Sequence, residues 1–399
     1  MFLVLLKIRA RKVLKMSKLR EDVKSFAEVS RKYPSEVRKL KSEGKKVVCW
    51  YGSYVPEEII YASGAIPYQL FDGGDPEPAD AALPYLLFCT NTQARYQVGQ
   101  HEMGLNPITS IADQIIIDTK ETDSVRVGNA FEYLGLPVTY LGVPSDWEKE
   151  IAFNYYKRQL GKLKDELEKL TGEEITNEKL AESIKKYNRV RELLNDIGSL
   201  RKEHPPALGG EEFIKLNHYS LRCDPDTAIN SLERILEGLK GEESIFPEDA
   251  LRIMVAGRGF AFGDYALLRI VEESGGVAVT EFLDEGIIHP EKVKADGSPM
   301  ENIAERYYRA KVPSCLFCPS WSKRWKHVSE LIDSYRVGGL LYYLLAFDVI
   351  YDYEYPIFSK RADEKEIPFA MIESAYDFSR EATATLRTRV ESFVKTCKR

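Results

Sequence analysis

Short apolar runs alternate with helical stretches in two separate parts of this sequence, and this alternation limits the folds that the chain can adopt. In the first part, from Val47 to about Pro144, the apolar runs include VVCWY, IIID and VTYLGV, and the helical stretch PEEIIYASGA follows the first of them. Parallel strands that are covered on both faces read as continuous apolar runs. The pattern therefore predicts βαβ units that form a parallel sheet.

The same alternation resumes at Arg252, with the runs RIMVAGRG, GVAVTEFL, GGLLYYLLAF and IPFAMIES. Between Trp147 and about Gly241 the apolar residues have helical spacing instead, which predicts two long helices with a break at TGEEITNEK. We therefore predict an α/β protein with two parallel-sheet domains, Rossmann or flavodoxin-like, and a helical middle segment. The predicted parts are an N-terminal helical segment (1–44), a first α/β domain (45–146), a helical region (147–245) and a second α/β domain (246–399).

The composition excludes several classes of protein. The chain has 399 residues, of which 44% are hydrophobic and 30% charged, and a net charge of −6 with both signs interspersed, so nucleic acid is not an expected partner. The apolar run at the N-terminus is far shorter than the ~20 residues that a membrane span needs. Six scattered cysteines fit a reducing cytoplasm better than a secreted disulfide framework.

A glycine-rich turn follows the first strand of the second domain. Gly257, Gly259 and Gly263 have the spacing GxGxxxG, which is one residue too long for the dinucleotide-binding fingerprint. The simpler interpretation is a tight turn between a strand and a helix, without a nucleotide. The sequence contains no GxxxxGK[ST] motif, so any ATP-driven step would need a separate protein.

Thiols are the most reactive candidates in the sequence. Cys315 and Cys318 form a CxxC pair, which could chelate a metal or one edge of a cluster, or form a redox disulfide, although two free buried cysteines are an equally good interpretation. A zinc site would need a second pair, which is missing. Cys89, in LLFCTNTQAR, ends an apolar run, where a structural role is more common. The five histidines show no HExxH spacing, and no GxSxG nucleophile elbow occurs.

The segment from Tyr54 to Pro67, YVPEEIIYASGAIP, resembles the YxPEELIYAAGxxP signature of a family of iron–sulfur enzymes. This family contains the 2-hydroxyacyl-CoA dehydratases and the benzoyl-CoA reductases. Further stretches resemble the family in order, among them FCTNTQAR, GDYALLRIVEESGGV, VGGLLYYLLAFDVIYDYEYP and LRTRVESF, so that the resemblance covers about Lys45 to Phe393.

The resemblance implies a subunit that binds an iron–sulfur cluster, expected to be [4Fe–4S], through cysteines of both domains, with an acyl-CoA thioester in the cleft. A separate ATP-dependent iron–sulfur activator would inject low-potential electrons, and a homologous sister subunit would complete the enzyme. Dehydratases of the family eliminate water through a ketyl radical, whereas the reductases reduce an aromatic ring. In both cases the cofactor performs the redox step.

The sequence departs from the family at its ligand positions. The cysteine expected before the YxPEE motif is replaced by Gly52 or Ser53, the late cysteine is replaced by Asp348, and only Cys89 matches directly. Two explanations compete. In the first, which we prefer at this point, Cys89 joins Cys315 and Cys318 as a rearranged ligand set. In the second, the subunit has lost its cluster and supports a cluster-bearing sister subunit.

Four further residues are candidates for roles at the site. Glu57 begins a helix, where a carboxylate stabilises the helix dipole, and a proton-transfer role is the alternative. Tyr54 is expected to line the substrate site. Arg387 and Arg389 could hold a phosphate of CoA or an acidic partner, and a structural salt bridge is an equally good interpretation.

These observations predict a cytoplasmic subunit of an anaerobic oxidoreductase or lyase that acts on an acyl-CoA thioester. The segments VIYDYEYP and SREATATLRTR are more similar to the benzoyl-CoA reductase branch, which we prefer over a 2-hydroxyacyl-CoA dehydratase. A cluster-free interaction subunit of such a complex is the rival from another class. A zinc-stabilised binding module at Cys315 and Cys318 is a third.

Overall fold

The computed structural model describes residues 2–240, 243–377 and 379–398. In this part of the chain, the long strands form two four-stranded sheets, and both sheets are entirely parallel. The strands are β1 (Val47–Tyr51), β2 (Ile66–Gln69), β3 (Gln114–Asp118), β4 (Val138–Leu141), β5 (Leu251–Gly257), β6 (Gly276–Leu283), β7 (Gly339–Leu345) and β8 (Phe369–Ser374). This arrangement confirms the predicted fold class.

The two sheets share one strand order. The first has the order β2-β1-β3-β4 and the second has the order β6-β5-β7-β8, so that in each sheet the chain moves first to one side and then to the other. In such doubly wound sheets, ligands bind outside the carboxyl ends of the strands at the point where the direction reverses. These switch points lie between β1 and β3, and between β5 and β7.

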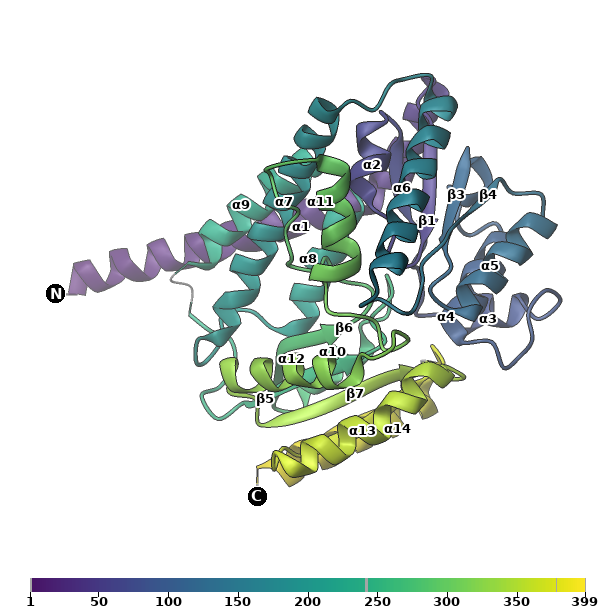
Figure 1. The fold of residues 1–399 in the computed structure, drawn as a ribbon. Coiled ribbons are helices and arrows are strands. Elements are labelled where there is room, and N and C mark those ends of the chain that lie inside the picture. Colours follow the sequence, from purple (N-terminus) through teal and green to yellow (C-terminus); the bar gives the residue numbers. More distant parts are fainter. Residues whose placement is uncertain (1, 241–242, 378, 399) are drawn as a thin grey trace.

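Helices cover both faces of each sheet (Figure 1). The helices are α2 (Glu57–Ala62), α3 (Pro76–Ala81), α4 (Thr92–Glu102), α5 (Thr122–Tyr133), α6 (Glu150–Thr171), α10 (Ala266–Glu273), α11 (Pro299–Glu305), α12 (Trp321–Ser334), α13 (Val349–Glu364) and α14 (Arg380–Cys397). One hydrophobic core contains residues of both sheets and of the helices α4, α5, α10 and α14. A second core lies between the first sheet and the helices α2 and α6, and a third lies between the second sheet and the helices α12 and α13.

The middle of the chain is helical, as predicted. The two predicted long helices are α6 and α7 (Asn177–Ser199), and Thr176 caps α7 by accepting a hydrogen bond from the backbone N–H of Lys179 at 3.3 Å. The sequence reasoning did not foresee α8 (Gly210–Leu221), α9 (Pro225–Leu239), or the short strand β2. Helix α1 (Phe2–Ser42) packs against α9 and α8. No helix in the described residues is long and apolar enough to cross a membrane.

A backbone contact ties the outer loops of the two sheets together. Asp72, after β2, and Phe262, after β5, form a parallel β-bridge, and Phe262 N–H donates to the carbonyl of Phe71 at 2.9 Å. Gly263 is needed here because a Cβ at this position would lie 2.5 Å from the carbonyl oxygen of Gly73. The contact holds the two switch points at a fixed separation.

The glycines around residue 258 serve close backbone packing. A Cβ on Gly257 would lie 2.0 Å from the carbonyl oxygen of Tyr343, and one on Gly259 would lie 2.2 Å from that of Glu285. Both glycines also have positive φ angles, of 125° and 143°. The structure thus confirms the tight turn, and the residue between the two glycines is aimed toward the first sheet.

Candidate functional site

The carboxyl ends of the two sheets face each other, and charged side chains from both fill the space between them. These side chains come from the residues just after the strands, where a doubly wound sheet presents its functional loops. The first sheet supplies Lys120 and Glu121 after β3, whereas the second supplies Arg258 after β5, Glu285 after β6 and Asp348 after β7. All five are buried.

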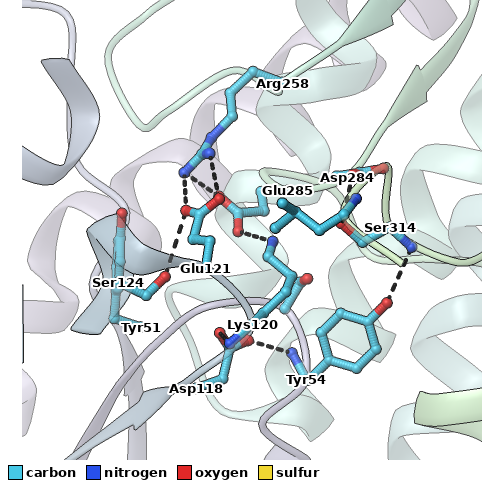
Figure 2. Close-up of polar contacts among 12 residues, drawn as sticks. Tyr51, Tyr54, Asp118, Lys120, Glu121, Ser124, Arg258, Asp284, Glu285 and Ser314 are labelled. Atoms are coloured by element: carbon cyan, nitrogen blue, oxygen red, sulfur yellow. Dashed lines mark hydrogen bonds and ion pairs between the residues drawn. The ribbon is translucent and has the colours of Figure 1, made fainter. Parts of the chain in front are cut away.

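Arg258 is the centre of this buried cluster (Figure 2). Its guanidinium donates to both carboxylate oxygens of Glu121, at 3.1 and 3.0 Å, and it lies 3.1 Å from Glu285 and 3.3 Å from Asp348. Although burial alone would lower the pKa of Arg258, the three carboxylates hold it well above its usual value. A fully buried cation that bridges two sheets is a strong constraint on their relative position.

Lys120 forms the second cation of the cluster. Its ammonium donates to Glu285 at 2.8 Å, and the carboxylates around it raise its pKa against the effect of burial. Beneath it, Asp118 accepts a hydrogen bond from the backbone N–H of Tyr54 at 3.0 Å. Gly52 makes this possible, since a Cβ at that position would lie 2.2 Å from the Asp118 carboxyl group.

A second chain of ion pairs continues from the cluster into the second domain. Arg324 donates to Asp284 at 2.6 Å and to the two oxygens of Glu354 at 2.5 and 3.0 Å. This guanidinium holds the pKa of Asp284 well below its usual value in spite of burial. Asp284 also accepts hydrogen bonds from the hydroxyls of Tyr351 and Ser314, at 3.0 and 3.3 Å.

Two polar groups beside the cluster are not satisfied. Within the described residues, neither carboxyl oxygen of Asp348 has a hydrogen-bond partner, nor does the buried hydroxyl of Ser53. Burial raises the pKa of Asp348 to about 8, and the opposing effect of Arg258 is not large enough to restore its usual value.

Glu57 lines a small polar cavity of about 50 Å³ next to this interface, together with Gly52, Ser53 and Arg306. Burial, and then the adjacent Glu58, raise the pKa of Glu57 to about 7. Glu58 behaves differently because Arg191 donates to it at 2.5 Å and the Tyr307 hydroxyl donates to it at 2.9 Å, which lowers its pKa. Glu57 can thus exchange a proton near neutral pH.

Tyr54 is buried between the two sheets. Its hydroxyl accepts a hydrogen bond from the backbone N–H of Ser314 at 3.2 Å, and its ring lies 5.0 Å from that of Phe317. Burial raises its pKa far above 10, so it stays a neutral phenol. Tyr54 joins the two halves, and it is not among the residues that line the small cavity beside Glu57.

The three candidate thiols lie in different surroundings. Cys315 is buried in the core of the second domain, where burial raises its pKa, whereas Cys89 and Cys318 are exposed. Cys89 follows Phe88, whose ring contacts that of Phe347 at 5.8 Å. No three His, Cys, Asp or Glu side chains gather to hold a metal ion in the described part of the chain, so the structure does not bring these sulfurs together.

Arg387 and Arg389 lie on α14, away from the facing strand ends. Arg387 donates to Glu273 of α10 at 2.5 Å, with both side chains substantially exposed. Neither arginine is among the residues that line the small cavity beside Glu57. The salt-bridge interpretation therefore describes Arg387, and the binding of a CoA phosphate by the two arginines stays a prediction.

The central residues of the cluster were not foreseen from the sequence. Arg258 was noted only as the residue between two glycines, and Lys120, Glu121 and Glu285 were not singled out. One signal was present, since each of these charged residues lies within four residues of the end of an apolar run. Their pairing across the interface had no signal, because the partners are 137 and 165 residues apart along the chain.

Comparisons with known proteins place this arrangement in a family. Residues 52–396 match the model of the 2-hydroxyglutaryl-CoA dehydratase D-component. The putative dehydratase subunit YjiM of Escherichia coli (strain K12) is 25% identical over 368 residues, which is 90% of this chain and 93% of that protein. A benzoyl-CoA reductase subunit of Thauera aromatica is 25% identical over 332 residues, with 82% and 84% covered.

A third relative has similar coverage. The (R)-2-hydroxyglutaryl-CoA dehydratase subunit beta of Acidaminococcus fermentans is 23% identical over 373 residues, which is 91% of this chain and 96% of that protein. The matches extend over both sheets and the helical segment between them. The chain therefore belongs to the 2-hydroxyglutaryl-CoA dehydratase D-component family, a family of oxidoreductase and lyase subunits.

Proposed function

We propose that this chain is a subunit of an enzyme complex that reduces or dehydrates an acyl-CoA thioester, and that it holds no iron–sulfur cluster itself. One observation carries the second part of the proposal. The space between the facing strand ends is filled by Arg258 and its three carboxylates, at contact distances of 3.0 to 3.3 Å. A sister subunit would then supply the cluster.

The residues at the expected ligand positions do not fit a cluster held by three thiolates. Fe–S clusters are usually held by cysteine thiolates. A side chain at Gly52 would overlap the Asp118 carboxyl group, Asp348 faces the guanidinium of Arg258, and Cys89 alone remains. The rearranged set of Cys89, Cys315 and Cys318 would require the buried Cys315 to leave the hydrophobic core. The geometry therefore favours the cluster-free alternative over the rearranged one.

Glu57 is the residue that we propose for proton transfer in such a complex. It has a pKa of about 7, it lies at a polar cavity, and the structure gives it no fixed hydrogen-bond partner among the described residues. A general acid or base works best when its pKa is near the operating pH. Its neighbour Glu58 is fixed by Arg191 and Tyr307 and is structural.

Exposed apolar side chains near Cys89 support the assignment as one subunit of a heteromer. Leu87, Phe88, Phe347 and Val349 are between 42% and 72% exposed, and they come from the loop that precedes α4 and from the segment between the end of β7 and the first residue of α13. The contact between Phe88 and Phe347 joins these loops into one surface. Clusters of exposed apolar residues commonly mark protein interfaces, and we propose the sister subunit as the occupant.

The choice between reduction and dehydration rests on the sequence alone. We keep benzoyl-CoA reductase as the preferred assignment, from the segments VIYDYEYP and SREATATLRTR, with 2-hydroxyacyl-CoA dehydratase as the alternative. The relatives of both kinds have almost the same identity to this chain. In either case we expect ATP to act through a separate activator.

The test is anaerobic purification of the complex with its sister subunit, followed by iron and sulfide analysis and by turnover of benzoyl-CoA and of 2-hydroxyacyl-CoA. The variants Cys89→Ala, Cys315→Ala and Cys318→Ala should leave the iron content of the complex unchanged, and this chain purified alone should hold no iron. Loss of iron in all three variants would instead establish the rearranged ligand set. Turnover of one substrate class decides between reductase and dehydratase.

A further inference from the structure

A cavity of about 480 Å³ lies where the start of β2 meets the helices α1, α2, α7 and α9. These helices pack against one another in this part of the molecule (Figure 1). The apolar part of the lining consists of Leu40, Ala62, Ala65, Ile66, Pro67 and Pro225. The cavity shares no lining residue with the small cavity beside Glu57. It has the size of a small-molecule site and is separate from the facing strand ends.

One polar group in this lining is buried and lacks a partner. Tyr33 is only 4% exposed, and its ring stacks on that of Tyr68 with the centroids 6.2 Å apart. No hydrogen-bond partner for its hydroxyl occurs among the described residues. Burial, and then the neighbouring Cys223, Asp224 and Glu36, raise the pKa of Tyr33 far above its usual value, so the hydroxyl stays neutral. A buried hydroxyl without a partner costs free energy, which a ligand at this place would recover.

Two carboxylates beside this hydroxyl lack a cationic partner. Glu36 and Asp224 both line the cavity, and neither forms an ion pair within the part of the chain that the structure describes. Asp224 caps α9 by accepting from the backbone N–H of Asp226 at 2.9 Å, and the Tyr61 hydroxyl is 3.5 Å from it. Lys186 is close, but its ammonium donates to Asp226 at 2.6 Å and to Tyr61 at 3.1 Å. This end of the cavity therefore carries negative charge without compensation.

The rest of the lining does not offset this charge. Lys179 donates to Glu173 at 2.9 Å, and this hydrogen bond, with a smaller contribution from Lys45, lowers the pKa of Glu173. Glu182 is 3.9 Å from the ammonium of Lys186. Taken together, the lining residues supply four carboxylates and two ammonium groups. The cavity thus favours a cationic ligand over an anionic one.

An ammonium group has the properties that the charged end of the cavity requires. It is a compact cation with three N–H donors, and the Tyr33 hydroxyl and the carboxylates of Glu36 and Asp224 provide three acceptors. Hydrogen bonds between an ammonium group and carboxylates are among the strong ones in proteins. The apolar lining is suited to methylene groups, which a bare metal ion would not supply.

We propose that this cavity binds a short aliphatic diamine, with one ammonium group at Tyr33, Glu36 and Asp224 and the methylene groups against the apolar lining. The two positive charges of a diamine equal the excess of carboxylates over ammonium groups in the lining. The bound diamine would contact α1 and the start of α9 at once and would therefore stabilise the folded chain. This site is independent of the acyl-CoA function proposed above.

Conservative variants can remove the charges with little change of shape. Glu36→Gln and Asp224→Asn are nearly isosteric, and Asn caps a helix as well as Asp does, so α9 should stay intact. Tyr33→Phe removes only the hydroxyl. The matched control is Glu28→Gln/Glu237→Gln, at exposed positions of the same two helices outside the lining, which changes the net charge equally.

The experiment is calorimetric titration of the full chain with 1,4-diaminobutane and with 1,4-butanediol at constant ionic strength, with thermal unfolding in each compound as a second measurement. The wild type should bind the diamine and not the diol, and its melting temperature should rise with the diamine concentration. Glu36→Gln/Asp224→Asn should weaken diamine binding by about tenfold or more, and Tyr33→Phe by about threefold or more. The control variant should bind the diamine as the wild type does.

Several results would overturn the proposal. A wild-type chain that binds the diol as tightly as the diamine, or binds neither, has no amine site. If the control variant loses as much affinity as Glu36→Gln/Asp224→Asn, only the overall charge attracts the diamine. Wild-type affinity in Glu36→Gln/Asp224→Asn or in Tyr33→Phe would exclude this cavity as the place of binding. None of these measurements depends on iron content or turnover, so the proposed function is judged separately.

Discussion

The interface between the two sheets and the edge of the second sheet both lie at the ends of parallel strands, yet one is filled and the other is open. At the interface, loops from the two sheets meet, and Arg258 and Lys120 occupy the space with their carboxylates. At the edge, the end of β6 faces the helices α7 and α8, and a cavity of about 350 Å³ remains.

This difference shows how a doubly wound sheet can lose its usual ligand position. The switch point is normally the ligand site. Here the two switch points face each other, and each supplies the counter-charges of the other, which leaves little volume for a ligand. The cavity near them, beside Glu57, has a volume of about 50 Å³. The cavity of about 350 Å³ lies on the far side of residues 287–289.

The largest expected effect is on the filled site. Arg258→Met removes the cation between Glu121, Glu285 and Asp348, and although Lys120 still pairs with Glu285, the buried Glu121 loses its ion-pair partner. Breaking a buried ion pair in this way costs about 3–5 kcal/mol. We expect a loss of that size in the free energy of unfolding, measured by urea denaturation.

The matched control is Arg387→Met, which breaks an ion pair whose side chains are 40% and 48% exposed. Exposed pairs contribute about 0–1 kcal/mol. Equal losses in the two variants would mean that the interface is hydrated and that the contrast between filled and open regions is wrong.

Glu57→Gln should make stability less sensitive to pH. The pKa of Glu57 is raised from 4.5 to about 7 in the folded state, so its contribution to stability is complete below pH 4.5 and is lost as pH rises through 7. The free energy of unfolding of the variant should therefore exceed that of the wild type by on the order of 3 kcal/mol at pH 8 and by almost nothing at pH 4. Urea denaturation at both pH values measures this, and a gain that is equal at the two pH values would contradict a buried, titrating Glu57.

Substitution of Lys311 and of Lys120, two buried lysines of the interface, should change the stability of the protein in opposite directions. Lys120 is paired with Glu285, whereas among the described residues Lys311 donates only to the carbonyl of Ser53, at 3.3 Å, and burial lowers the pKa of Lys311 to about 7. A lysine with a lowered pKa loses stability as pH falls toward that value. Lys311→Met should therefore stabilise the protein by roughly 1–3 kcal/mol at pH 7, and by more at pH 6 than at pH 9.

Lys120→Met should instead destabilise the protein at all three pH values, because it leaves Glu285 without its partner at 2.8 Å. Thermal or urea unfolding of the two variants measures both effects. If the two substitutions have the same sign, Lys311 has a partner that the described contacts do not include.

The smallest expected effect is at Ser53. Its buried hydroxyl has no hydrogen-bond partner among the described residues, so Ser53→Ala removes an unsatisfied group instead of an interaction. We expect the free energy of unfolding to change by no more than about 0.5 kcal/mol, with a slight increase. A loss of more than about 1 kcal/mol would show that the hydroxyl is bound, for instance by water in the cavity beside Glu57.

Much of the fold could be predicted from the sequence because most of its strands are buried on both faces and read as plain apolar runs. VVCWY and IIID became β1 and β3, and the two halves share a strand order. The strand β2 was missed because IPYQ is short, contains Pro67 and follows directly after a helix and its terminal Gly64. In this position its extended backbone depends on pairing with β1, which a local pattern does not reveal.

The site was less predictable than the fold. Glu57 was singled out through a motif, and its raised pKa is consistent with a proton-transfer role that stays a prediction. Arg258 was overlooked because its importance comes from residues that are distant along the chain. The thiols had the reverse problem, because the spacing of Cys315 and Cys318 is suggestive of a metal site while their side chains are respectively buried and exposed. Spacing does not report the direction of a side chain.

The β-bridge between Asp72 and Phe262 has a consequence for how the molecule could evolve. Together with the bond between Tyr54 and Ser314 and the core shared by both sheets, it makes each half a part of the other's folded surface. If recombination exchanged one half with that of a related protein, residues that contact each other across the interface between the two halves would no longer match. We therefore expect the two halves to be inherited together and to unfold in one transition, in spite of their identical strand order.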